Sequence, residues 1–258
     1  MTYRYFIELA YKGTNFHGWQ IQPNAPTVQH ELNSALGILL KEKTETLGAG
    51  RTDTGVHARF FTAHFDSQKK DLHLKENLIY KINQLIHKDI AVKRLIPVKE
   101  DANARFDAIS RTYKYYISKV KDPFLKELCF EYHGKLDINR MNEAAEIILE
   151  YEDFTSFCKL HSDVKTMICK IYESKWAQND EMIVYTIKAD RFLRNMVRAI
   201  VGTIFDVGRN KIDIERFKQI IESKNRNLAS ASAPARGLYL TDIEYNNSVY
   251  LKTYKKNC

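Results

Sequence analysis

The chain has 258 residues, 44% of them hydrophobic, which is enough to bury a core in one large domain or two modest ones. Lysine and arginine outnumber aspartate and glutamate by 40 to 32, and the net charge of +8 favours polyanionic partners such as nucleic acid over acidic proteins. No apolar stretch could span a bilayer, and the N-terminal segment is charged where a secretory signal is apolar, so we expect a cytoplasmic protein with no membrane anchor.

The first half of the chain predicts the element order βαββαβ. Period-two alternation indicates strands, and apolar residues at helical spacing indicate helices. The predicted elements are a strand at residues 3–11, a helix at 28–40, strands at 44–48 and 58–65, a helix at 74–86 and a strand at 90–97. Thr27 is well placed to cap the first helix, because its hydroxyl can accept a hydrogen bond from a free backbone N–H.

The second half repeats a similar order without residue-level repetition. Its predicted elements are extended structure at 106–118, a helix at 138–150 capped by Asp137, strands at 168–176 and 182–189, a helix at 191–207 ended by Gly208, a short helix at 214–223 and a strand at 237–245. The polar segment 98–105 separates the halves. We therefore expect two related α+β domains, at residues 1–104 and 105–258, with loops near the centre of a broad concave floor.

The loop at residues 50–58 is the first candidate for chemistry. Asp53 lies between Gly50 and Gly55 and two positions from Arg51. Glycine permits a tight bend and the close approach of a ligand, and a nearby guanidinium keeps a carboxylate ionised. Such an aspartate can serve as a nucleophile or a base. On composition alone a simple polar turn, with Arg51 in solvent, is the commoner explanation, so the loop needs support from other residues.

Aromatic and basic residues alternate along the extended segment 104–116. Residues two apart share a face of a strand, which places Arg111, Tyr113 and Tyr115 on one side. A tyrosine ring stacked on a base is typically worth about 1 to 3 kcal/mol. The alternative is that these tyrosines line the core of the sheet.

Two further residues could contribute to the same site. In the helix predicted at 191–207, Arg191, Arg194 and Arg198 fall at i, i+3 and i+7 and form a cationic stripe. The stripe is either a solvated surface or a means for Arg198 to reach the Asp53 carboxylate or a phosphate. Leu238, at the start of the last strand, could close an apolar wall over a base, or it could be ordinary core.

The sequence carries no signature of a metal, a disulfide framework or a nucleotide cofactor. The four cysteines, among them Cys258, form no CxxC pair, and the eight histidines form no HExxH spacing. GxxxxGK[ST] and GxGxxG loops are also absent. We therefore expect a site that needs only protein and substrate.

Taken together, the motifs resemble those of the TruA family of tRNA pseudouridine synthases, and they extend along nearly the whole chain. They are FHGWQIQ at 16–22, TVQ at 27–29, GAGRTD at 48–53, ARF at 104–106, RTYKY at 111–115, DFTSF at 153–157, MVRAIVG at 196–202 and GLYL at 237–240. One departure is Thr54, where the family commonly has alanine. That change should alter local packing without removing the carboxylate.

The resemblance implies a role for each candidate residue. Asp53 would be the catalytic aspartate, Arg51 would help to extrude the base, and Tyr113 would stack on the uracil. Arg198 would pair with Asp53, and Leu238 would pack against the base. The implied fold is two ferredoxin-like α+β domains that form a continuous, mainly antiparallel sheet with a central cleft, the pseudouridine synthase fold.

The resemblance also implies the reaction and the partners. The family converts uridine to pseudouridine at positions 38 to 40 in the tRNA anticodon arm, without cofactor or metal, and as a homodimer. Because the product is an isomer, no redox carrier is required. Asp53 could attack C1′ as a nucleophile or remove a proton from C2′. Two alternatives remain open: a non-catalytic RNA-binding protein, which would not need Asp53, and a nucleoside hydrolase-like enzyme, which would release free uracil.

Overall fold

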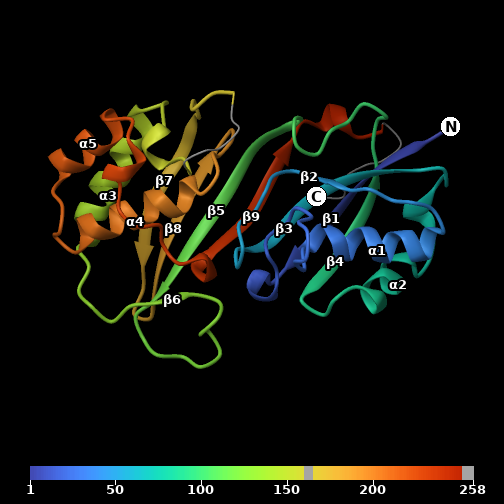
Figure 1. Ribbon diagram of the computed structural model, residues 1–258, viewed down its shortest axis with the longest axis horizontal. Coiled ribbons are helices and arrows are strands. Elements are labelled where there is room, and N and C mark those ends of the chain that lie inside the picture. Colours follow the sequence, from blue (N-terminus) through green and yellow to red (C-terminus); the bar gives the residue numbers. More distant parts are fainter. Residues whose placement is uncertain (160–164, 252–258) are drawn as a thin grey trace. The chain divides into compact units, whose positions relative to one another are not determined.

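The computed structural model describes residues 1–159 and 165–251, and Figure 1 labels their helices and strands. Within these residues the chain forms five α-helices and nine strands, most of them antiparallel, which confirms the predicted α+β class. The predicted central cleft stays a prediction. The chain divides into two compact units. Unit 1 contains Met1–Ile109 and the described part of Leu240–Cys258, and unit 2 contains Ser110–Tyr239.

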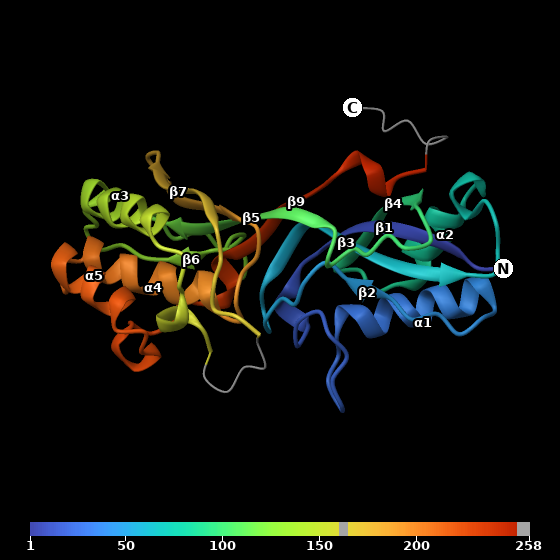
Figure 2. The same ribbon diagram turned by 90° about the horizontal axis from the view of Figure 1, so that it is seen from above.

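Unit 1 has the predicted order βαββαβ. Its elements are β1 (Tyr3–Tyr11), α1 (Val28–Leu40), β2 (Leu47–Gly48), β3 (His57–Ser67), α2 (Leu78–Leu85) and β4 (Ile90–Pro97). Strand β1 is antiparallel to both β3 and β4, and β2 pairs with β3. In Figure 2, α1 lies along one face of these strands. It buries Val28, Leu32 and Leu36, and the Thr27 hydroxyl accepts a hydrogen bond from the His30 backbone N–H, as expected of the cap.

The C-terminal segment returns to unit 1. Strand β9 (Leu238–Tyr245) is the neighbour of β3, and its residues from Leu240 onward belong to this unit. The Tyr245 hydroxyl donates to the Ala104 carbonyl oxygen at 2.6 Å, and Tyr250 joins a buried cluster with Phe6. The structural division therefore differs from the predicted domains, 1–104 and 105–258, chiefly in the last strand. The difference arises because the core of unit 1 is completed by residues from the far end of the chain.

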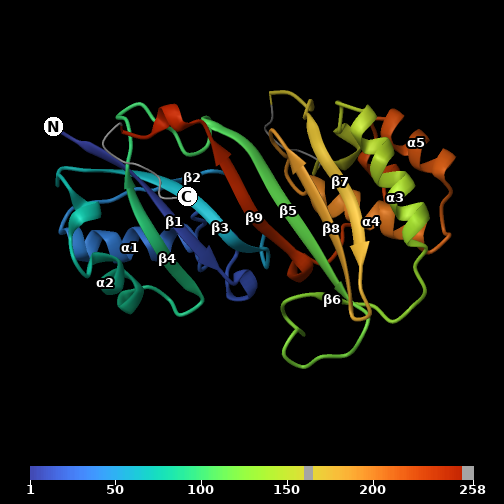
Figure 3. The same cartoon turned by 180° about the vertical axis from the view of Figure 1, so that it is seen from behind.

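Unit 2 is built from the middle of the chain. Its elements are β5 (Ala108–Ser118) from Ser110 onward, β6 (Phe130–Glu131), α3 (Ile138–Ile147), β7 (Ile171–Gln178), β8 (Met182–Ala189), α4 (Met196–Gly208) and α5 (Ile214–Glu222). Figure 3 shows β8 between β5 and β7, and both pairings are antiparallel. Helix α3 contacts β7, α4 and α5, so the three helices share one core with the sheet.

Helix α4 begins later than expected. Its first residue is Met196, and Asn195 before it has φ +64°, in the left-handed region. An α-helix cannot continue through such a residue, so Arg191 and Arg194 precede the helix. The predicted stripe of three arginines on one helical face is therefore wrong, and only Arg198 lies on α4.

Two general properties follow from the described part of the chain. None of its helices has both the length and the apolar character needed to cross a bilayer. Cys129, Cys158 and Cys169 are buried free thiols, whereas Cys258 lies outside the described residues.

Candidate functional site

The loop that carries Asp53 connects β2 to β3 in unit 1. The side chain of Asp53 is half-buried, and that of Arg51 is exposed. The Val56 backbone N–H donates to the Asp53 carbonyl oxygen at 3.1 Å and closes a turn, within which Gly55 has φ +77°. The left-handed region favours glycine at that position, as the loop pattern predicted. The role predicted for Gly50, to leave room for a ligand, stays a prediction; its φ is not positive, and no protein atom lies within 4 Å of a Cβ added there.

The segment that follows η1 (Gly13–Asn15) forms backbone hydrogen bonds with this loop. The Trp19 backbone N–H donates to the Thr52 carbonyl oxygen at 3.3 Å, and the Gly55 N–H donates to the Phe16 carbonyl oxygen at 3.3 Å. Gly18 has φ +85°, and a Cβ there would lie 2.2 Å from the Thr52 carbonyl oxygen. The FHGWQIQ motif thus fixes the backbone on both sides of Asp53.

The base of the loop is also fixed by side chains. The Tyr11 and Thr52 hydroxyls share a hydrogen bond of 2.9 Å, and both residues are buried. The Gly13 N–H donates to Nδ1 of buried His57 at 2.9 Å, so this ring nitrogen carries no proton. Sequence reasoning missed Tyr11, Gly18 and His57 as supports of the loop. The only available signal was their place within or beside the motifs, since the contacts join distant parts of the chain.

Unit 2 holds the candidate base-stacking residue. Tyr113 lies half-buried on β5 opposite Ile187, and its ring meets the Phe192 ring edge to face, with centroids 5.2 Å apart. Tyr115 is fully buried and donates its hydroxyl to the Pro234 carbonyl oxygen at 2.9 Å, and its burial raises the pKa of the phenol. The core explanation therefore holds for Tyr115, whereas Tyr113 is only half-buried.

Arg198 is attached to the segment that leads into β9. Its Nε donates to the Ala233 carbonyl oxygen at 2.8 Å, and the Ala233 N–H donates to the Arg198 carbonyl oxygen at 2.9 Å. The segment packs directly on α4, because a Cβ at Gly202 would lie 2.0 Å from the Ala231 carbonyl oxygen. Leu238, the first residue of β9, is 5% exposed. Its burial fits ordinary core as well as a wall beside a base.

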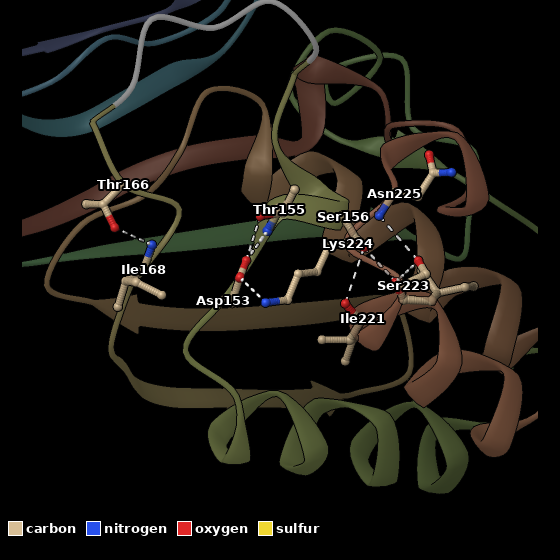
Figure 4. A network of polar contacts seen from close by, with 10 residues as sticks. Asp153, Thr155, Ser156, Thr166, Ile168, Ile221, Ser223, Lys224 and Asn225 are labelled. Carbon is tan, nitrogen blue, oxygen red and sulfur yellow. Dashed lines mark hydrogen bonds and ion pairs between the residues drawn. The ribbon is translucent and has the colours of Figure 1, made fainter.

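The DFTSF motif forms a polar network in unit 2 (Figure 4). Asp153 Oδ1 accepts hydrogen bonds from the backbone N–H and the hydroxyl of Thr155 at 3.0 and 2.6 Å, and Lys224 Nζ lies 2.9 Å from Oδ2. Burial acts to raise the pKa of Asp153, but these donors outweigh it and the pKa is lowered. Buried Ser156 donates to the Ile220 carbonyl oxygen at 2.6 Å. The network ties the motif to the end of α5 and has a structural role.

The candidate residues thus fall into two groups. Asp53 and Arg51 share one loop of unit 1, and Tyr113, Arg198 and Leu238 belong to unit 2. The predicted pair of Arg198 with Asp53 joins residues of different units and stays a prediction. Among residues 1–159 and 165–251, no group of three or more histidine, cysteine, aspartate or glutamate side chains could hold a metal ion.

Comparison with known proteins gives a consistent result. Residues 151–246 match the family model described as tRNA pseudouridine synthase. A Bacteroides fragilis protein named tRNA pseudouridine synthase A is 52% identical over 248 residues, which cover 96% of this chain and 98% of that protein. A protein of the same name from Parabacteroides distasonis is 51% identical over 249 residues, which cover 96% of this chain and 98% of that protein. The one from Bacillus subtilis is 37% identical over 243 residues, which cover 93% of this chain and 98% of that protein. The chain therefore belongs to the tRNA pseudouridine synthase A (TruA) family, as its motifs predicted.

Proposed function

We propose that this protein isomerises uridine to pseudouridine at positions 38 to 40 in the anticodon arm of tRNA. The observation that carries the proposal is the loop of unit 1, where backbone hydrogen bonds hold both sides of a half-buried Asp53. The extended similarity to relatives named tRNA pseudouridine synthase A supports the tRNA substrate. The positive net charge of +8 suits a polyanion.

The chemistry requires few groups. The bond from N1 to C1′ breaks, the uracil turns, and C5 bonds to C1′; the hydrogen on C5 leaves as a proton, and N1 gains one. In our proposal ionised Asp53 attacks C1′ or removes the C2′ proton. The uridine must first leave its stack, which costs a few kcal/mol, and Tyr113 and Leu238 offset that cost by holding the uracil. Arg51 assists extrusion, and Arg198 supplies positive charge for Asp53.

The partners follow from the same resemblance. We propose a homodimer that binds the tRNA anticodon arm, and a cytoplasmic location. An isomerisation neither consumes nor supplies electrons, so the reaction as written balances without a redox cofactor. No metal is assigned a part in it.

The decisive experiment follows tritium released from tRNA that contains uridine labelled at C5. The parent protein should release tritium while the base stays attached to the tRNA, because only formation of the C5–C1′ bond expels that hydrogen. Asp53→Asn should keep its fold and its affinity for tRNA and lose turnover by at least about 100-fold, since it removes the proposed nucleophile or base. As a control, Asp66→Asn in β3 removes only a half-exposed ion pair with Arg4 and should turn over normally.

The alternatives make different predictions in this assay. A non-catalytic RNA-binding protein would release no tritium, and a nucleoside hydrolase-like enzyme would release free uracil. Parental turnover of the Asp53→Asn variant would remove Asp53 from its proposed role.

The stacking role is tested by a second pair of variants. Tyr113→Ala removes a ring whose stacking is worth about 1 to 3 kcal/mol, so kcat/KM should fall by about 5- to 150-fold, whereas Tyr113→Phe should retain the stacking. Tyr172 on β7 is 46% exposed, and Tyr172→Ala provides the matched loss of a surface tyrosine. Normal binding and modification of tRNA by Tyr113→Ala would rule out the stacking assignment.

A further inference from the structure

A buried hydroxyl pair lies directly beside the catalytic position. Tyr11, the last residue of β1, is 4% exposed, and its hydroxyl lies 2.9 Å from Oγ1 of Thr52, which is 8% exposed. Thr52 immediately precedes Asp53 in the chain. A buried polar group left without a partner is costly, so this bond favours one orientation of the Thr52 side chain.

The tyrosine ring has little freedom to move. Its centroid lies 5.6 Å from that of Phe61 and 6.5 Å from that of Trp19, and Phe61 and Trp19 stack on each other at 4.2 Å. The backbone of Tyr11 is paired with β3 at Ala58. The residue that supplies the hydroxyl to Thr52 therefore belongs to a rigid strand rather than to a loop.

The backbone contacts of the loop act in the same direction. The Thr52 carbonyl oxygen accepts from the Trp19 N–H, the Asp53 carbonyl oxygen accepts from the Val56 N–H, and the Gly55 N–H donates to Phe16. The Tyr11 hydroxyl holds the side chain of Thr52, and the Trp19 N–H holds its main chain. Together these two contacts fix Thr52, the residue immediately before Asp53.

We propose that Tyr11 is a positioning residue for Asp53, acting through the hydroxyl of Thr52. The inference rests on the proposed role of Asp53 in catalysis. A carboxylate that reacts at a ribose carbon must be held within a fraction of an ångström, and a displacement of about 1 Å can cost about 100-fold in rate. Without the Tyr11 hydroxyl the loop would keep its fold but hold Asp53 less firmly, so the chemical step would slow while tRNA binding would not change.

The test measures kcat and KM for tRNA in Tyr11→Phe and in Thr52→Val and Thr52→Ser. We expect kcat to fall by about 10- to 100-fold in Tyr11→Phe and Thr52→Val, with KM within about twofold of the parent. Thr52→Ser keeps the hydroxyl and should retain a kcat near that of the parent. Tyr11→Phe combined with Thr52→Val should be no slower than the slower single variant, because both remove the same bond.

The control is Tyr5→Phe in the same strand. Tyr5 is 1% exposed, and its hydroxyl donates to the Lys69 carbonyl oxygen at 2.9 Å, away from the loop. The same hydroxyl accepts the Leu72 N–H at 3.4 Å, so Tyr5→Phe removes at least as many contacts of a buried tyrosine and should keep the parental kcat. The inference fails if kcat is unchanged in Tyr11→Phe or if KM alone rises. It also fails if Tyr5→Phe loses as much kcat as Tyr11→Phe, or if Thr52→Ser is as slow as Thr52→Val. Losses of kcat that multiply in the double variant would contradict it as well.

Failure of the inference is distinguishable from failure of the proposed function. If Asp53→Asn is inactive and Tyr11→Phe turns over normally, Asp53 keeps its role and Tyr11 loses its own. If Asp53→Asn turns over normally, the catalytic role itself is wrong, whatever Tyr11→Phe does.

Discussion

The glycines near Asp53 differ in what they contribute, although the sequence makes them look alike. Gly18 has a left-handed backbone and faces the Thr52 carbonyl oxygen, so no side chain fits there. Gly50 has neither constraint, although it lies in the same loop as Asp53. Besides Gly55 within the loop, a residue from a different motif, Gly18, therefore shapes the loop.

Substitution of these two glycines should have unequal effects on stability. In Gly18→Ala the left-handed φ costs about 1 to 2 kcal/mol, and the clash of Cβ with the Thr52 oxygen adds to it, so we expect the free energy of unfolding to fall by at least about 2 kcal/mol. Gly50→Ala should stay within about 0.5 kcal/mol of the parent. Denaturant unfolding of both variants checks the prediction. Equal losses would contradict it.

At the scale of elements, hydrophobic periodicity predicted most of the fold. The bounds of α1 and β4 match the residue pattern, because each buries one regular face against the sheet. The start of α4 was missed, since the left-handed Asn195 interrupts the backbone where apolar residues continue on both sides. Hydrophobic periodicity shows which face of a helix or strand is buried, but it carries little information about residues with a left-handed backbone.

The candidate site was predictable to the extent that it is local. Asp53, Arg51 and Gly55 are neighbours in the sequence, so the chemistry of their loop was visible there. The supports of that loop, Tyr11 and Gly18, come from β1 and from the segment before α1. Contacts between distant segments depend on how the sheet folds, and no local pattern specifies them.

A buried histidine links β3 to the segment after β4 and makes stability depend on pH. His64 is 7% exposed, and its Nδ1 accepts the Ala104 N–H at 3.1 Å. Burial, with a smaller contribution from the charge of Arg4, lowers its pKa to about 4, although the carboxylates of Asp66 and Asp107 act in the opposite direction. The neutral ring is thus favoured in the native state, and the unfolded chain binds more protons between pH 6.5 and 4.

Stability should therefore fall as the pH drops through this window. With pKa values of about 6.5 unfolded and about 4 folded, His64 contributes a loss of about 2 kcal/mol in the free energy of unfolding between pH 7 and pH 5. His64→Gln should remove that part of the pH dependence, which denaturant unfolding at the two pH values measures. His30→Gln, at an exposed position, should leave it in place. If both variants lose stability as the parent does, the assignment to His64 is wrong.

At the scale of the whole molecule, unit 1 is discontinuous in sequence and unit 2 is continuous. The polar segment near residue 100 indicated a boundary, but nothing in the composition showed that the last strand returns to the first half. The return is stabilised by the bridge between Val98 and Tyr250 and by the hydrogen bond from the Lys99 N–H to the Val249 carbonyl oxygen at 3.0 Å. The stability of unit 1 should consequently depend on residues near the C-terminal end.

Replacing Tyr250 by alanine tests that dependence in the full chain. Tyr250 is 8% exposed, and its ring meets Phe6 edge to face at 6.4 Å, so truncation leaves a cavity in the core of unit 1 and should cost about 3 kcal/mol. Hydrogen exchange should then speed up at the amides of β1 and β4, which open with this core, and stay unchanged at those of β7 and β8. Leu251→Ala, at a position 38% exposed, should change neither set. Equal acceleration in β7 and β8 would mean that the two units open together, because the loss of a unit 1 contact would then have destabilised the whole chain.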